Sequence, residues 1–152
     1  MAAIFNDDFR DFIRAMNNNN VEYIVVGGYA VILHGYRRVT GDLDIWVNRT
    51  KENYSKLTLA FAEFGLPVFD MTEEKFLDAD TVDVFSYGRS PVSIDIITKL
   101  KGVIFEDAFA QSQIFNEEGL TIRFIHLNNL IQSKKAAGRY KDLDDIEKLT
   151  SN

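Results

Sequence analysis

Apolar positions along the chain follow two periods, one typical of helices and one typical of strands. Apolar side chains three and four positions apart predict helices over residues 7–16, 29–35, 51–64, 103–112 and 127–149. Alternating apolar and polar side chains, with β-branched and aromatic residues, predict strands over residues 21–26, 42–47, 81–87, 92–97, 113–115 and 120–125. Residues 66–80 show neither period, so we expect them to be irregular.

Caps and turn residues mark where several of these elements end. Asn6 and Thr50 are predicted N-caps, because their side chains can accept a hydrogen bond from the first helical turn. Gly138 predicts a weak point in the last helix. Turn residues at 88–91 and 116–119 predict two hairpins.

The order of these elements predicts an α/β (α+β) fold, with a mixed β-sheet flanked by helices and with C-terminal helices. A doubly wound Rossmann fold is disfavoured, because hairpins imply antiparallel pairing and no G-x-G-x-x-G motif follows the first strand. Neither a repeat nor a linker interrupts the chain. We therefore expect a single domain over residues 1–152, with its core at 21–100 and a C-terminal helical segment at 127–149.

Composition narrows the class of protein. The 152 residues are 46% hydrophobic and 26% charged, as in ordinary globular domains, and the absence of cysteine excludes disulfides and thiolate metal sites. No run approaches the ~18 apolar residues of a membrane span, and the first residues lack the pattern of a signal peptide, so we expect a cytoplasmic protein without membrane contacts. A net charge of −6 disfavours a broad grip on nucleic-acid phosphates but leaves room for a local basic groove.

Three carboxylates lie in predicted strands with apolar neighbours: Asp42 and Asp44 in DLDIWV, and Asp95 in SIDII. Alternation places Asp42 and Asp44 on one face, where their mutual repulsion and partial burial cost free energy unless a cation compensates. Mg²⁺ prefers one or two carboxylates together with phosphate oxygens and water. The alternative is that these residues face solvent on a one-sided sheet. Asp83 in TVDVF is a rival for the third carboxylate.

A diglycine, Gly27-Gly28, joins the first predicted strand to a helix. Glycines at such a junction bring bare backbone N–H groups and the positive end of a helix close to an anion, which indicates a phosphate cradle. A tight turn with no ligand is the alternative. The diglycine becomes more specific in combination with the downstream Asp-x-Asp and a third strand aspartate.

This combination resembles the nucleotidyltransferase superfamily with the DNA polymerase β-type palm. GGYAVILHGYRRVTGDLDIWV is more closely similar to the small minimal nucleotidyltransferases grouped with the AbiEii toxins, and SKKAAGRYKDLDDIEKL resembles their C-terminal helical motif. Gly28 stands where many transferases have a phosphate-binding serine. The matching positions are Gly27, Gly28, His34, Gly35, Arg38, Thr40, Asp42, Asp44, Lys134, Arg139, Asp142 and Asp145.

The resemblance implies that Asp42, Asp44 and Asp95 are catalytic and bind two Mg²⁺ ions, with Mn²⁺ as a substitute. Asp95 would also help to deprotonate an acceptor hydroxyl. The implied reaction moves a nucleoside monophosphate from an NTP to RNA, a protein or a small molecule and releases pyrophosphate. The implied nucleotide-binding residues are Gly27, Gly28, Arg38, Thr40, Lys134 and Arg139.

Other readings remain open at this point. The chain could instead be a catalytically silent nucleotide-binding or partner-regulating protein, for example one half of a toxin–antitoxin pair, or a plain structural domain. Asp142 and Asp145 either form surface pairs or hold Lys134 or Arg139. His34 is expected to be structural.

Two further cations and one aromatic residue have open roles. Arg37 and Lys135 are additional candidate contacts for a phosphate or an acceptor, with a solvated surface charge as the alternative. Trp46 either stacks on a base or packs in the sheet.

Overall fold

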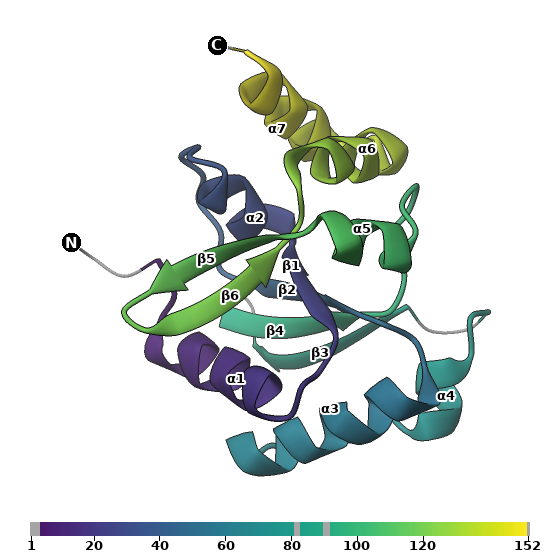
Figure 1. Cartoon of the computed structure of the whole chain (residues 1–152). Coiled ribbons are helices and arrows are strands. Elements are labelled where there is room, and N and C mark those ends of the chain that lie inside the picture. The colour runs from purple at the N-terminus through teal and green to yellow at the C-terminus, as the bar shows by residue number, and fades with distance from the viewer. Residues whose placement is uncertain (1–3, 81–82, 90–91, 152) are drawn as a thin grey trace.

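Helices and strands mix along the chain in the computed structural model, which describes residues 4–80, 83–89 and 92–151 (Figure 1). The helices are α1 (Asp7–Asn18), α2 (Gly27–Leu33), α3 (Lys51–Phe64), α4 (Glu73–Leu77), α5 (Phe105–Gln111), α6 (Leu127–Ala137) and α7 (Tyr140–Thr150). The strands are β1 (Tyr23–Val26), β2 (Leu43–Val47), β3 (Val84–Arg89), β4 (Val92–Ile97), β5 (Gln113–Glu117) and β6 (Leu120–Phe124).

The strands form one six-stranded mixed sheet in the order β3-β4-β2-β1-β6-β5. The two predicted hairpins, β3–β4 and β5–β6, are confirmed as antiparallel pairs, and β1 also pairs with β2 in antiparallel fashion. Two pairings, β2 with β4 and β1 with β6, are parallel. The expected mixed sheet flanked by helices is therefore present, and it excludes an all-parallel doubly wound arrangement.

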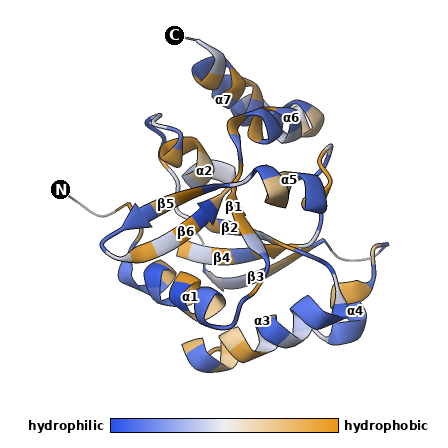
Figure 2. Cartoon of the chain, viewed as in Figure 1, coloured by the Kyte–Doolittle hydropathy of each residue, from blue (hydrophilic) through white to orange (hydrophobic). Residues whose placement is uncertain are grey.

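Each face of the sheet carries its own apolar core, and helices cover both faces (Figure 1). On one face α1 packs against α3, where the Phe12 ring meets the rings of Phe61 and Phe64 edge to face. On the other face α5 covers β2, where the rings of Trp46 and Phe105 meet edge to face with centroids 5.1 Å apart. Figure 2 shows the corresponding alternation of apolar and polar residues along the strands and helices.

Local signals for the helix ends are confirmed. The Asn6 side chain accepts a hydrogen bond from the backbone N–H of Phe9 at 2.8 Å, and Thr50 Oγ1 accepts one from Asn53 at 3.1 Å. Gly138 adopts φ = 67° and separates α6 from α7. No helix in the described ranges is long and apolar enough to cross a membrane.

Three local expectations need correction. Helix α1 runs on through Asn18 into the asparagine segment, and α2 begins at Gly27 rather than after the diglycine. Residues 66–80 are not wholly irregular, since they contain the short α4, capped by Thr72 and anchored by buried Phe76. Because α4 buries only one side chain, its sequence shows no repeating apolar pattern, and the sequence analysis did not predict this helix. The start of the predicted strand 81–87 lies outside the described residues.

Candidate functional site

The parallel pairing of β2 with β4 places Asp44 and Asp95 directly opposite each other. Directly paired residues point to the same face on strands about 4.8 Å apart, so the two carboxylates are neighbours. Asp42 precedes β2, and its Oδ1 accepts a hydrogen bond from Ser93 Oγ at 2.8 Å. Asp83 is exposed and pairs with Arg49 at 3.0 Å. It is thus Asp95, and not Asp83, that lies beside Asp44.

Asp44 lies in an environment that disfavours its charge. Burial, followed by the carboxylates of Asp95 and Asp42, raises the pKa of Asp44 to about 7, and the positive charge of Lys141 opposes this rise. Asp95 Oδ1 is buried and accepts no hydrogen bond from the described part of the chain. Uncompensated carboxylate oxygens of this kind are what a hard dication would neutralise.

The three carboxylates are close, but they are not arranged as a finished ligand set. Within residues 4–80, 83–89 and 92–151, no group of three His, Cys, Asp or Glu side chains has the geometry of a metal site. Asp42 is held by Ser93 Oγ. This hydrogen bond uses only Oδ1, so the second oxygen of Asp42 can still serve as a metal ligand.

The raised pKa of Asp44 predicts an unusual dependence of stability on pH. A carboxyl whose pKa is near 3.8 when unfolded and about 7 when folded keeps its proton longer in the folded protein. The metal-free protein should therefore lose stability as pH rises from about 4 to about 7, and melting temperatures measured by circular dichroism should fall over this range. In Asp44→Asn this contribution should disappear. If the melting temperatures of wild type and Asp44→Asn changed in parallel between about pH 4 and about pH 7, the burial of this charge would be contradicted.

The diglycine packs directly against predicted site residues. A Cβ on Gly27, which has φ = 67°, would overlap the carboxylate of Asp44. A Cβ on Gly28 would overlap the Arg38 guanidinium and the Thr40 hydroxyl. The structure thus gathers Asp44, Arg38 and Thr40 around the turn, and a serine at position 28 would not fit without moving Arg38 or Thr40.

Replacement of Gly27 by alanine should damage this arrangement. We expect Gly27→Ala to lower the free energy of unfolding by roughly 1–3 kcal/mol from backbone strain alone, and by more because its methyl group displaces Asp44. Gly35→Ala is the matched control, since Gly35 also has positive φ (94°) but a Cβ there meets nothing within 4 Å. Urea denaturation of both variants measures the difference. Equal losses would contradict close packing of the turn on Asp44.

A buried cluster of ion pairs joins the α2–β2 loop to α6 and α7. Asp145, 2% exposed, accepts a hydrogen bond from Arg38 Nε at 3.0 Å and pairs with Lys134 Nζ at 2.9 Å. Asp142, which is 1% exposed, accepts hydrogen bonds from Arg139 Nε at 2.6 Å and from Arg139 Nη2 at 3.2 Å. Both aspartates are therefore buried: Asp145 holds Arg38 and Lys134, and Asp142 holds the exposed Arg139.

The cations of this cluster differ in the solvent exposure of their side chains. The side chain of Lys134 is 7% exposed and lies between both aspartates, whereas the side chain of Arg139 remains 61% exposed while Asp142 holds it. Although burial opposes ionisation, the hydrogen bonds and charge of Arg139, with the charge of Lys134, keep the pKa of Asp142 below its ordinary value. Arg139 is thus a fixed cation that faces solvent.

Lys141 is a site residue that the sequence analysis missed. It lies in the first turn of α7, is exposed, and its charge acts on Asp44. In the sequence it stands next to Asp142 in a helix rich in charge, where it looks like an ordinary surface lysine. No spacing signal could have singled it out, because its proximity to Asp44 depends on how α7 docks.

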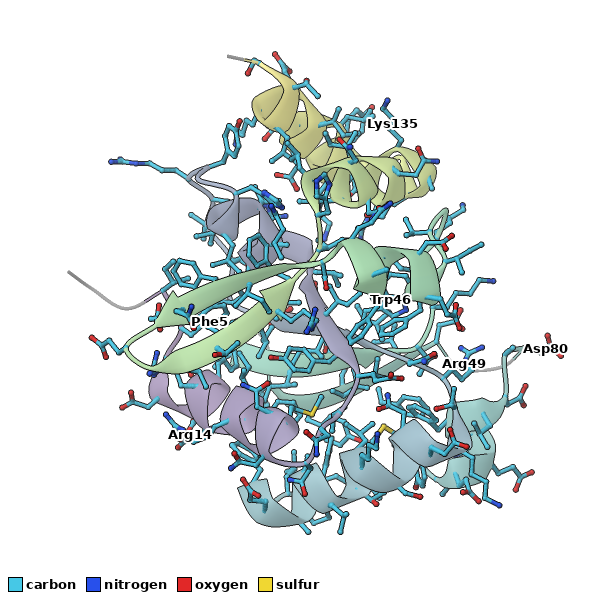
Figure 3. All side chains as sticks on the ribbon, viewed as in Figure 1. Phe5, Arg14, Trp46, Arg49, Asp80 and Lys135 are labelled. Carbon is cyan, nitrogen blue, oxygen red and sulfur yellow. The ribbon has the colours of Figure 1, made fainter. Side chains whose placement is uncertain are left out.

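Two predicted alternatives are resolved by packing. His34 Nε2 hydrogen-bonds the carbonyl of Ile125 at 2.8 Å, its ring meets Phe124, and burial lowers its pKa, so its role is structural. Trp46 is 2% exposed beneath α5, which leaves no free face for a base (Figure 3). Arg37 and Lys135 are exposed.

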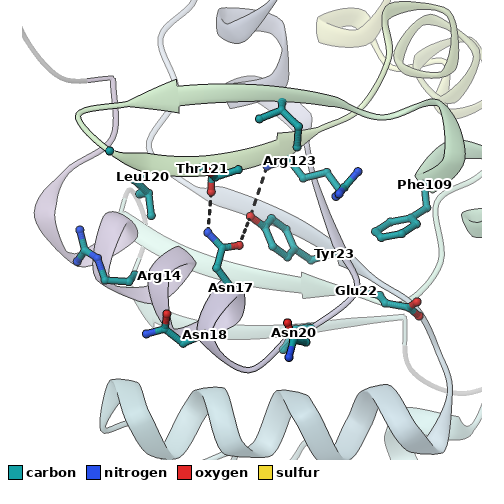
Figure 4. Close-up of a pocket in the computed structure, with 13 residues that line it drawn as sticks. Arg14, Asn17, Asn18, Asn20, Glu22, Tyr23, Phe109, Leu120, Thr121 and Arg123 are labelled. Carbon is teal, nitrogen blue, oxygen red and sulfur yellow. Dashed lines mark hydrogen bonds between the residues drawn. The ribbon is translucent and has the colours of Figure 1, made fainter.

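A separate groove of about 600 Å³ lies between α1, β1, α5 and β6, away from the carboxylates (Figure 4). Its polar groups bind one another: Asn17 donates to the Thr121 carbonyl at 2.6 Å, and the Tyr23 hydroxyl donates to Asn17 at 2.8 Å. Arg123 lies over the Phe109 ring at 4.6 Å. The polar lining thus contributes to the fold of this region.

Similarity to known proteins is found in the structure and not in the sequence. The sequence matches no family model and no curated protein. The structure is similar to that of a proposed nucleotidyltransferase from Thermotoga maritima, with a TM-score of 0.63 and 15% identity over 92% of this chain and 88% of the other. It is also similar to an antigenic nucleotidyltransferase-like protein from Paracoccidioides brasiliensis, with a TM-score of 0.53 and 13% identity over 92% and 72%. The chain thus has the nucleotidyltransferase-like fold that its motifs predicted.

Proposed function

We propose that the protein transfers a nucleoside monophosphate from an NTP to an acceptor hydroxyl and releases pyrophosphate. The observation that carries this proposal is the in-register pairing of Asp44 with Asp95 beside the Gly27-Gly28 turn. Phosphoryl transfer depends mainly on positioning and on neutralising the charge of the triphosphate, and this arrangement supplies residues for both.

The carboxylates would hold the metal ions. Asp42, Asp44 and Asp95 offer the oxygen ligands that Mg²⁺ or Mn²⁺ takes, with Ser93 orienting the Asp42 carboxylate, and two ions fit the number of carboxylates. Bound there, the ions would neutralise the triphosphate and the leaving pyrophosphate. Asp95 would accept the proton of the acceptor hydroxyl.

The surrounding cations would bind and orient the phosphates. Arg139 is exposed yet fixed by Asp142, and Lys141 acts on Asp44, so both can meet an anion at the carboxylates. Arg38 and Thr40 lie against Gly28, next to the turn. Lys134, which is buried, would act through Asp145 by fixing the position of Arg38.

A catalytically silent nucleotide-binding or partner-regulating protein, including half of a toxin–antitoxin pair, is the second candidate. It would need no complete set of metal ligands, whereas Asp42, Asp44 and Asp95 are all present. Membership of the AbiEii-like group and the nature of the acceptor remain predictions from sequence motifs.

Transfer of label from the α-phosphate tests the proposal. The protein is incubated with Mg²⁺, an NTP labelled at the α-phosphate, and separate pools of RNA, protein or small-molecule acceptors. We expect one pool to gain the label in step with pyrophosphate release. Transfer of the γ-phosphate to an acceptor, which leaves the label on an NDP and releases no pyrophosphate, would instead indicate a kinase and contradict the proposed reaction.

A further inference from the structure

The hairpin β3–β4 extends the row of functional side chains by one residue. Ser86 on β3 is the direct partner of Asp95 on β4, which in turn is the direct partner of Asp44 on β2. Neighbouring strands are about 4.8 Å apart, so the Cα atoms of Ser86 and Asp44 lie roughly 10 Å apart, with Asp95 between them. A serine hydroxyl therefore flanks the proposed base.

Burial along β3 confirms which face Ser86 occupies. Phe85 and Tyr87 are 7% and 6% exposed and belong to the core on the α1 and α3 side of the sheet. Because side chains alternate along a strand, Ser86 points to the opposite face, the one that carries Asp44 and Asp95. Ser86 is exposed, since β3 is an edge strand.

Small residues lie beside Ser86 on this face of the sheet. Two other positions on this face beside Asp95 are small, Gly88 and Ser93. Ser93 is 7% exposed and its hydroxyl already donates to Asp42. Of the two described serines next to the carboxylates, Ser86 is thus the accessible one and lies directly opposite Asp95.

We propose that Ser86 is an acceptor for self-nucleotidylylation, an inference that rests on the proposed function. Ser86 Oγ attacks the α-phosphorus of the NTP and forms a phosphodiester bond. The bond from the α-phosphorus to the bridging oxygen breaks, and pyrophosphate leaves with that oxygen. The hydroxyl proton passes to the Asp95 carboxylate. The product is a nucleoside monophosphate attached to Ser86.

Intact-mass spectrometry after incubation with each NTP and Mg²⁺ tests the modification. We expect wild type to gain the mass of one nucleoside monophosphate, with peptide mapping placing it on Ser86. Ser86→Ala should lose the adduct, and Ser86→Thr, which keeps a hydroxyl, should retain part of it. Ser55→Ala is the matched control, since Ser55 is an exposed serine on α3, beyond the other face of the sheet, and should keep the adduct.

A second readout does not require transfer. Because the chain has no cysteine, Ser86→Cys and Ser55→Cys each carry a single thiol. An NTP with Mg²⁺ should slow alkylation of the thiol at position 86 and leave that at position 55 unchanged.

The outcomes separate the two proposals. NTP binding with transfer to another acceptor, but no adduct at Ser86 and no protection of the thiol there, would overturn the role of Ser86 and leave the transferase intact. An adduct that persists in Ser86→Ala would also overturn it. Absence of any NTP binding would overturn both.

Discussion

Asp44→Asn should lower the rate of nucleotidyl transfer on the order of a thousandfold while leaving the protein folded. The substitution removes one of two carboxylates that face each other across β2 and β4, and with it a ligand for the metal ions. It keeps the shape of the side chain and removes a charge whose ionisation burial opposes. The melting temperature above pH 7 should therefore stay the same or rise. Initial rates of pyrophosphate release and thermal melts measure the two effects.

Asp83→Asn is the control for this experiment. Asp83 directly precedes β3, is exposed, and forms an ion pair with Arg49 away from Asp44. Its substitution should change the rate less than about twofold, as expected for an exposed pair outside the site. Comparable losses in the two variants would contradict the assignment of Asp95, rather than Asp83, as the partner of Asp44.

Asp145→Asn should destabilise the protein by about 3–5 kcal/mol, because it leaves the largely buried Arg38 without this counter-charge and buried Lys134 with only the more distant Asp142. Arg38 Nε and Lys134 Nζ both contact this carboxylate, at 3.0 Å and 2.9 Å. Since the cluster joins the α2–β2 loop to α6 and α7, its loss should also release the C-terminal helices. Urea denaturation followed by circular dichroism measures the change.

Asp144→Asn is the matched control, one residue away on the same helix. Asp144 pairs with Lys148 at 3.0 Å, but its side chain is 60% exposed, so its loss should cost less than about 1 kcal/mol. Equal destabilisation by the two substitutions would show that the cluster contributes no more than a surface pair. A large loss confined to Asp145→Asn would support its role in docking α6 and α7.

Residues close together in the sequence were sufficient to predict much of the fold. The Asn6 and Thr50 caps, the break at Gly138 and the two hairpins depend on nearby residues, and all are present. The parallel contact of β2 with β4 could not be deduced from periodicity, because it joins strands separated by α3 and α4. The proximity of Asp44 and Asp95 followed only from the family resemblance.

Burial of charged residues in the C-terminal helix could not be predicted from the sequence pattern. Asp142 and Asp145, three positions apart among other charges, have the pattern of a solvated helix face, yet they are 1% and 2% exposed. Their burial depends on cations from α6 and from the α2–β2 loop, which only the tertiary structure brings together. The same docking places Lys141 near Asp44, where no motif predicted it.

Calorimetry of NTP binding tests the central claim most directly. Each NTP is titrated into wild type and into the Asp42→Asn/Asp44→Asn double variant, with Mg²⁺ and with a chelator. We predict that at least one NTP binds wild type only with Mg²⁺, and that the folded double variant does not bind it. Failure of every NTP to bind folded wild type in the presence of Mg²⁺, or equal binding by the double variant, would contradict a metal-dependent nucleotidyltransferase.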